Sequence, residues 1–299
     1  MNASVHLLNK AVRTTMRVRS EIPSGHSSAG ILGTERMGAG TVVEPSGLVL
    51  TAHYLVIGAQ SVEVTPPDGQ SLPGRVVGVD HSSGLAAVEV VGGRLPGLPV
   101  RQTTESVVGE EAFLVAAHEE GRRVSNGVVT SYAPFEAFWE YMVDRALTCS
   151  AASPGLGGGP LVDARGEMLG VVSLSLAEVG KFTLAVPACS AMQMIESIEK
   201  SGGYTNATPH AWIGVTSYPV GGNVIVAGVL PDSPAEAGGV APGDIVVAVS
   251  GDAVKDRRTL YQAIWKTSPG GTVHVSVRRG DEFLELDIES SSIEKYFGP

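Results

Sequence analysis

The feature that most constrains the fold is the stretch of residues 153–162, which holds three consecutive glycines after a Pro-Gly pair. Glycine costs roughly 0.5–1 kcal/mol relative to alanine inside a helix or a strand, so this run favours neither. Such runs occur where backbone N–H groups crowd together or where φ turns positive. Because apolar residues flank the run at 146–152 and 161–162, the sequence predicts a tight loop between two strands.

The composition indicates a globular protein built mainly from β-strands. Of its 299 residues, 43% are apolar and 17% are charged, which excludes an intrinsically disordered chain. The 38 glycines and 18 prolines follow no repeat, and this pattern favours many short strands and turns. The net charge of −10 argues against nucleic-acid binding, which needs a basic surface.

The sequence predicts neither a metal site nor a cofactor site. Its seven histidines lack the spacing of zinc ligands, and Cys149 and Cys189 form no Cys-x-x-Cys pair. Two cysteines are too few for a disulfide framework. We expect two buried free thiols, with a single bridge between them as the alternative.

Neither a membrane-spanning segment nor a signal peptide is predicted. No run approaches the ~20 apolar residues that cross a bilayer. The first 15 residues also lack the apolar core of a signal peptide. Two alternatives therefore stay open, a cytosolic protein and a chain from which an export signal has been removed.

The pattern of strands and turns predicts two domains. Two series of strand candidates and a segment of helical spacing precede a polar, glycine-containing linker. Five further strand candidates and two helix candidates follow the linker. The predicted parts are a first domain at 1–200, a linker at 201–209, a second domain at 210–292 and a C-terminal tail at 293–299.

The first domain carries sequence blocks that resemble those of the HtrA (Deg) family of trypsin-like serine proteases, in the same order. The blocks are residues 38–43, 50–59, 76–86, 154–162 and 184–187. The resemblance implies a chymotrypsin-like fold, in which two six-stranded β-barrels hold the site between them. It also implies a bacterial role in protein quality control and a periplasmic or other extracytoplasmic location.

The catalytic positions of the HtrA family hold other residues in this chain. In the family, the catalytic base follows a threonine by three residues and precedes a glycine by four. Thr51 and Gly58 both assign this position to Tyr54. The position of the orienting aspartate falls on Gly84, and that of the nucleophilic serine falls on Gly157. The resemblance therefore implies a degenerate triad.

The family's oxyanion loop corresponds here to Gly155, Leu156 and Gly157. His53 lies one residue before the base position, and a shift of one residue turns a side chain by about 100° on a helix. Since serine, histidine and aspartate act as a unit, we predict that the chain is a pseudoprotease and not an enzyme. The alternative is an active serine endopeptidase with a rearranged site that uses His53.

The second domain resembles a PDZ domain of the HtrA kind, above all in the block at residues 241–251. A PDZ domain binds an extended C-terminal peptide along an open sheet edge. The resemblance implies that backbone amides of Trp212, Ile213 and Gly214 hold the terminal carboxylate, and that the ligand strand pairs from Val215 onward. Leu260 and Ile264 would then line an apolar pocket for the last ligand residue.

We therefore predict a regulatory scaffold whose partners are peptide or protein C-termini and an active HtrA-type protease. A structural subunit that co-assembles with such a protease is a further alternative. The aromatic stretch at residues 135–141 predicts either a loop packed on the second barrel or an exposed apolar patch for a partner.

Overall fold

A computed structural model describes residues 3–92, 94–102, 107–152, 157–175, 182–204 and 209–298, apart from the side chains of residues 3–7 and 175. The chain forms two compact units. The first comprises Met1–Ala133 and Arg145–Thr205, and the second comprises Pro134–Asp144 and Asn206–Pro299. The predicted first domain, at 1–200, included the segment Pro134–Asp144, which the structure assigns to the second unit.

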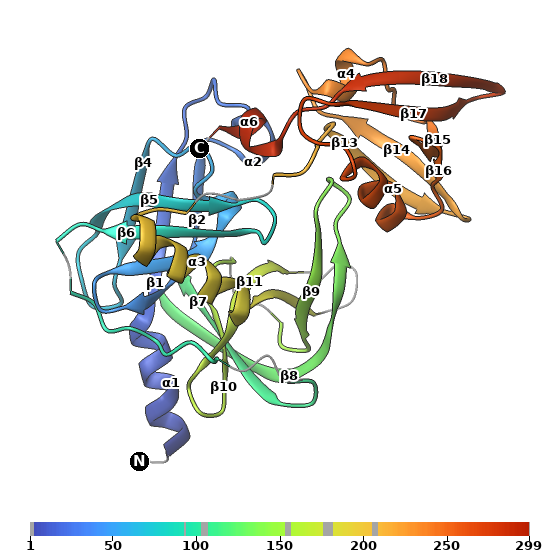
Figure 1. Ribbon diagram of the computed structural model, residues 1–299. Helices are drawn as coiled ribbons and strands as arrows, with labels where there is room; N and C mark the ends of the chain where they lie inside the picture. The colour runs from blue at the N-terminus through green and yellow to red at the C-terminus, as the bar shows by residue number, and fades with distance from the viewer. Residues whose placement is uncertain are drawn as a thin grey trace. The chain divides into compact units, whose positions relative to one another are not determined.

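The first unit begins with helix α1 (Ala3–Thr14) and continues into a closed six-stranded barrel, shown in blue to cyan in Figure 1. Its strands pair in the order β1-β2-β3-β6-β5-β4. Their bounds are β1 Thr15–Glu21, β2 Glu35–Glu44, β3 Leu48–Ala52, β4 Ser61–Thr65, β5 Leu72–Asp80 and β6 Leu85–Val90. Every residue of β3 is buried, whereas β4 alternates between exposed and buried positions, as a strand with one face on the core does.

Two short helices lie between strands of this barrel. Helix α2 (Ala29–Leu32) precedes β2, and the 3₁₀ turn η1 (His53–Leu55) follows β3 directly. This turn carries His53 and Tyr54, so the end of β3 sets the position of both side chains.

A second closed barrel has the strand order β10-β11-β12-β9-β8-β7. Its strands are β7 Glu111–His118, β8 Gly121–Glu136, β9 Met142–Cys149, β10 Pro160–Asp163, β11 Met168–Ser175 and β12 Thr183–Pro187. Helix α3 (Ala188–Ser201) follows β12 and packs the buried side chains of Ala191 and Met194 into a core cluster. The six-stranded barrels confirm the predicted chymotrypsin-like architecture.

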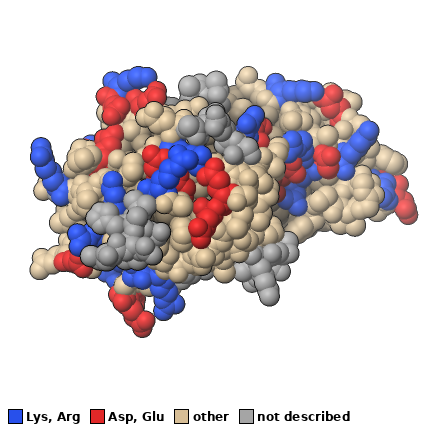
Figure 2. Space-filling model, turned by 90° about the horizontal axis from the view of Figure 1, so that it is seen from below, with Lys and Arg blue, Asp and Glu red and all other residues tan. Residues whose placement is uncertain are grey.

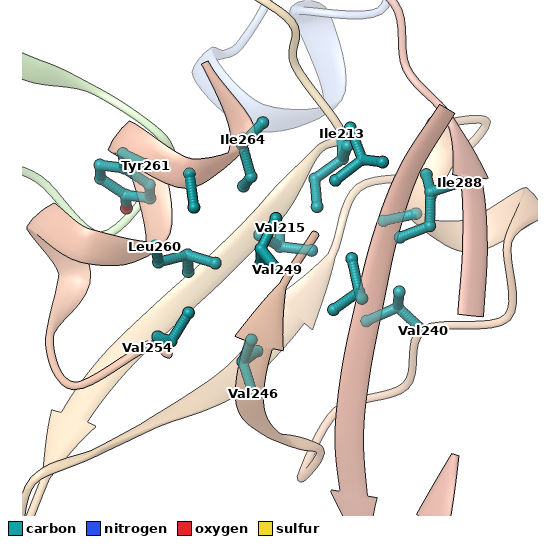
Figure 3. Packing of buried hydrophobic residues seen from close by; sticks show 14 of the residues in the cluster. Ile213, Val215, Val240, Val246, Val249, Val254, Leu260, Tyr261, Ile264 and Ile288 are labelled. Carbon is teal, nitrogen blue, oxygen red and sulfur yellow. The ribbon is translucent and has the colours of Figure 1, made fainter. Parts of the chain in front are cut away.

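The second unit holds a six-stranded sheet with the order β13-β14-β15-β17-β18, in which β16 pairs with β15. The strands are β13 Val215–Val220, β14 Asn223–Val229, β15 Ile245–Val249, β16 Asp252–Ala253, β17 Thr272–Arg279 and β18 Glu282–Glu289. The helices are α4 Pro234–Ala237, α5 Arg257–Ile264 and α6 Ile293–Phe297. Leu260 and Ile264 of α5 pack on the sheet in a core of valine and isoleucine side chains (Figure 3).

Sequence patterns explain where the helices of the second unit begin. Ser233 caps α4 by accepting a hydrogen bond from the Glu236 amide, and Pro234 takes the first helical position. Asp256 and Thr259 form a reciprocal capping box at the start of α5. These caps fix α5 beside β13, where the predicted peptide groove lies.

The described residues give no sign of a membrane span or a disulfide. No helix among them is both long enough and apolar enough to cross a membrane. Cys149 and Cys189 are both free, as expected, although Cys189 is only half-buried. On the face drawn in Figure 2, lysine and arginine side chains lie among aspartate and glutamate side chains.

Candidate functional site

The Tyr54 phenol lies against Gly157, so the structure brings together two of the three predicted triad positions. Tyr54 Oη donates a hydrogen bond to the Ser173 carbonyl oxygen at 3.0 Å. A Cβ atom on Gly157 would lie 2.3 Å from Tyr54 Oη and 2.6 Å from the Ser173 oxygen. The phenol therefore takes the space that a side chain at position 157 would need.

Tyr54 acts here as a hydrogen-bond donor. Burial raises its pKa to about 12, although the backbone N–H of Gly157 lowers the pKa in part. The hydroxyl is thus protonated at neutral pH. A protonated phenol cannot remove a proton from a nucleophile, so Tyr54 does not replace the imidazole of a triad.

The glycines after Gly157 let the loop approach two strands closely. The Gly157 carbonyl accepts a hydrogen bond from the Ala39 amide at 2.9 Å, and the Gly158 amide donates to the Val172 carbonyl at 2.7 Å. Gly158 has φ +93°, and a Cβ there would lie 1.9 Å from the Ala39 oxygen. The predicted tight loop is confirmed from Gly157 onward. Gly155 and Leu156 lie outside the described residues.

Gly84 ends a tight turn beside the same region. Its φ is +80°, a conformation that favours glycine. The Asp80 carboxylate folds back on this turn, accepting hydrogen bonds from the Ser82 amide at 3.0 Å and the Ser83 hydroxyl at 2.5 Å. The carboxylate of Asp80 is therefore a structural part of the turn.

Two nitrogen atoms of His53, one in the backbone and one in the ring, contact the Gly84 carbonyl oxygen. The His53 amide donates to this oxygen at 2.9 Å, and His53 Nδ1 lies 3.0 Å from it. Burial, together with the neighbouring His81 ring at 5.7 Å between centroids, lowers the pKa of His53 to about 3. The imidazole is neutral at pH 7 and is a much weaker base than an ordinary histidine.

The sequence analysis missed Arg36, which holds the Tyr54 turn in place. Its guanidinium is buried and donates to the carbonyls of Tyr54 at 2.8 Å and Ile57 at 3.1 Å, and to the Ser28 hydroxyl at 2.6 Å. Burial lowers the Arg36 pKa to about 10. No local pattern marks an arginine whose partners are carbonyls 18 and 21 residues later in the chain.

The second candidate site is a carboxylate-binding loop in the second unit. The amides of Ile213, Gly214 and Val215 donate to the carboxylate of Glu140 at 3.2, 2.5 and 2.9 Å. The Trp212 amide donates instead to the Ser291 carbonyl at 2.8 Å. The predicted assignment of Trp212 to this loop is therefore wrong by one residue, because its amide pairs with the chain that follows β18.

The other predicted groove residues share one cluster of buried side chains. Leu260 and Ile264 of α5 join Ile213 and Val215 in one buried cluster, as Figure 3 shows. The side chain of Met142 belongs to the same cluster. The aromatic stretch at 135–141 belongs to the second unit and not to the second barrel, and its Phe138 is 41% exposed, as the alternative of an exposed apolar patch describes.

No metal site is evident in the described part of the chain. Those residues contain no group of three or more histidine, cysteine, aspartate or glutamate side chains placed to hold a metal ion.

Comparison with known domains defines the class of protein. Residues 38–171 match the trypsin-like peptidase domain, and residues 211–289 match the PDZ domain. The chain thus combines a trypsin-like domain with a PDZ domain.

Sequence relatives match most of the chain. The chain is 29% identical over 283 residues to a Synechocystis sp. protein named as serine protease HhoA, and the match covers 86% of this chain and 71% of that protein. It is 28% identical over 281 residues to a Hahella chejuensis protein named as a DegP-like periplasmic serine endoprotease. That match covers 84% of this chain but only 56% of the relative, so this chain spans little more than half of the relative's length.

Solved structures share the fold over almost the whole chain. The HtrA-type protease AlgW with a decapeptide has a TM-score of 0.58 at 20% identity, covering 97% of this chain and 98% of that one. The serine endoprotease from Yersinia pestis has a TM-score of 0.59 at 20% identity, covering 98% and 99%. Together with the two domain matches and the sequence relatives, these likenesses make the chain similar to trypsin-like serine proteases of the HtrA type that carry a PDZ domain.

The enzyme class predicted from the sequence needs correction. We predicted that the chain is not an enzyme, because its triad positions are degenerate. The relatives are named as serine proteases and serine endoproteases, so the comparisons indicate a family of enzymes. The prediction of a non-enzyme is therefore wrong.

Proposed function

We propose that this HtrA-like chain is a regulatory, peptide-binding protein whose PDZ domain recognises extended C-terminal peptides. One observation carries the proposal. Backbone amides of Ile213, Gly214 and Val215 converge on a carboxylate group beside the start of β13. A loop that presents three amides to one carboxylate is suited to a peptide C-terminus, which every protein ligand carries.

The trypsin-like domain supports this proposal as a scaffold. We assign Tyr54, Gly84 and Gly157 to the three triad positions. The phenol of Tyr54 then fills the space beside Gly157 and is hydrogen-bonded to the Ser173 carbonyl. An active HtrA-type protease is the partner that such a scaffold would regulate.

Binding of synthetic peptides to the full chain tests the proposal. We expect free-acid peptides ending in Val, Leu, Ile or Phe to bind, because Leu260 and Ile264 make the groove apolar. Amidation of the peptide C-terminus should weaken binding at least about tenfold, since it removes the charged carboxylate to which the amides donate. Equal binding of the free acid and the amide would contradict the proposal and favour a structural subunit.

The names of the relatives favour a second candidate function, peptide-bond hydrolysis. It would need groups other than the side chains at positions 54, 84 and 157, and His53 is the imidazole nearest to them in the sequence. Turnover of unfolded casein, lost in His53→Ala, would support hydrolysis. Turnover at buffer background by the folded protein, without fluorophosphonate labelling, would contradict it.

A further inference from the structure

The tip of the β8–β9 hairpin lies along the groove that the PDZ resemblance assigns to peptides. Strand β8 ends at Glu136 and β9 begins at Met142, and the segment Pro134–Asp144 belongs to the second unit. The tip is closed by a hydrogen bond from the Ala137 amide to the Tyr141 carbonyl at 2.8 Å. The turn at the end of this hairpin is thus part of the second unit.

Glu140 is the centre of this contact. Glu140 is only 5% exposed, and its φ of +50° is unusual for a residue other than glycine. Oε1 accepts from the Ile213 amide, while Oε2 accepts from the amides of Gly214 and Val215. Burying a carboxylate is costly unless such donors surround it. The loop and the side chain therefore satisfy each other.

The backbone of the tip is fixed on both sides of the groove. From β13, the Ser217 amide donates to the Phe138 carbonyl at 2.8 Å. From α5, the Tyr261 hydroxyl donates to the Ala137 carbonyl at 2.7 Å and accepts from the Glu140 amide at 3.0 Å. Main-chain pairing with β13, opposite α5, is the mode by which an extended peptide adds to a PDZ sheet edge.

An apolar side chain and an ion pair complete the contact. Met142 is 9% exposed and joins the cluster that contains Leu260 and Ile264. At the other end of the tip, Glu136 Oε1 accepts from Nε and Nη2 of Arg258 at 2.7 and 2.5 Å. The tip therefore supplies a carboxylate, a pairing backbone and an apolar side chain, which are the parts that a C-terminal peptide would supply.

We propose that residues 136–142 are an internal ligand of the PDZ groove, in which the Glu140 side chain takes the place of a C-terminal carboxylate. This inference rests on the proposed function, because it concerns the same groove. An external peptide must displace the tip before it binds. A tethered ligand acts at an effective concentration of about the millimolar range. The apparent affinity for external peptides is therefore the affinity of the free groove multiplied by the fraction of molecules whose groove is free.

Peptide affinities of matched variants test the internal ligand. The probe is a fluorescein-labelled octapeptide ending in a free valine, measured by anisotropy on the full chain. Glu140→Gln keeps the size of the side chain and removes its charge, and Glu140→Ala removes the carboxylate altogether. We expect both to bind the probe about ten- to a hundredfold more tightly than the wild type, because neither the NH2 group of glutamine nor the methyl group of alanine can accept the backbone N–H groups that Glu140 accepts. Glu282→Gln, at an exposed position of β18, is the control and should leave the affinity unchanged.

Hydrogen exchange on the same proteins reports docking without any peptide. The amides of Gly214 and Val215 should be protected in the wild type and exchange at least about tenfold faster in both Glu140 variants. Circular dichroism confirms that each variant is folded. Unchanged exchange and an unchanged peptide affinity in the two variants would overturn the internal ligand.

The two measurements separate the internal ligand from the proposed function. Faster exchange in the Glu140 variants without peptide binding by any protein supports the internal ligand and rejects peptide recognition. Equal and tight binding of the free-acid probe by wild type and variants, with equal exchange, supports peptide recognition and rejects the internal ligand.

Discussion

The triad region of the first unit and the peptide groove of the second unit are both occupied by side chains of the chain itself. At the triad positions, the Tyr54 phenol lies against Gly157, where a Cβ atom would come within 2.3 Å of its oxygen. In the groove, the Glu140 carboxylate accepts hydrogen bonds from three consecutive amides. The two sites differ in what would have to change before another molecule could enter.

At the triad positions the occupant is tied to packed strands. Tyr54 sits in the turn after β3, and buried Arg36 holds the carbonyl of Tyr54. In the groove the occupant is a hairpin tip whose contacts include hydrogen bonds, one methionine, the stacked rings of Phe138 and Tyr218, and a partly exposed ion pair. The comparison indicates a packed site in the first unit and an exchangeable one in the second.

The largest effect is expected from Gly158→Ala, which tests how tightly the glycine loop is packed. A Cβ at Gly158 would lie 1.9 Å from the Ala39 carbonyl oxygen, and its φ of +93° disfavours alanine. We expect a loss of at least about 4 kcal/mol in the free energy of unfolding of the first unit. Urea denaturation measures it.

Gly92→Ala is the matched control for this loss. Gly92 also has a positive φ, +77°, but no atom lies within 4 Å of the position of its Cβ. Only the backbone strain remains there, so the expected cost is roughly 1 kcal/mol. Similar costs for both variants would mean that the loop is not closely packed on β2.

A double-mutant cycle between Tyr54 and Gly157 tests whether the phenol occupies the triad site. Gly157→Ala should cost about 2–4 kcal/mol, because its Cβ would meet Tyr54 Oη and the Ser173 oxygen. Tyr54→Phe should cost about 1 kcal/mol for the lost hydrogen bond. Together the changes should cost less than their sum by about 1 kcal/mol or more, since phenylalanine removes the nearer clash. Strict additivity would show that the two positions do not share this space.

The pH dependence of peptide binding is the next effect and concerns the groove. Burial raises the pKa of docked Glu140 to about 7 from 4.5, although three amides oppose the shift. Between about pH 4.5 and 7 the released side chain is ionised while the docked one keeps its proton, so docking weakens as the pH rises. Wild-type affinity for a free-acid peptide should increase by up to about tenfold per pH unit and level off above pH 7.

The groups facing Glu140 leave it as the titrating group in this range. Burial raises the pKa of Tyr261, which therefore stays protonated. The ligand carboxylate is ionised above about pH 5. Glu140→Gln should flatten the profile. An unchanged slope in that variant would assign the pH dependence to groups other than Glu140.

The fold was predictable from the sequence because its evidence is distributed along the chain. Alternating apolar positions, turn residues and blocks in family order each indicated the double barrel and the PDZ sheet. The prediction for Tyr54 rested on two independent anchors, Thr51 and Gly58. The contact of Tyr54 with Gly157 joins residues about a hundred positions apart in the sequence. The only sequence signal for this contact was the glycine at position 157, where the family has a serine.

The role of Glu140 could not be predicted, since its partners come from a distant segment. The Ile213 amide lies 73 residues further along the chain, and backbone donors leave no trace in the side-chain pattern. The one signal was a glutamate among aromatic residues at a hairpin turn. The error at Trp212 has a related cause, because the direction of an amide depends on which strand it pairs with, here at Ser291.

The smallest effect is expected from Glu136→Gln, at the other end of the tip. The pair of Glu136 and Arg258 is well formed, but the side chains remain 27% and 36% exposed. Ion pairs of this exposure contribute about 0.2–1 kcal/mol and are screened by salt. The Arg257 bond to the Glu136 carbonyl, at 2.9 Å, is made by the backbone and survives the substitution.

We therefore expect Glu136→Gln to raise the affinity for the free-acid probe only about 1.5- to 5-fold at low salt, and less at 0.5 M salt. Glu140→Gln should keep most of its larger effect at high salt, because its carboxylate is buried on amides rather than paired with an exposed cation. Anisotropy titrations at both salt concentrations measure the difference. Equal, salt-sensitive effects of the two substitutions would mean that the tip is held by its overall negative charge. In that case Glu140 would not be acting as the counterpart of a terminal carboxylate.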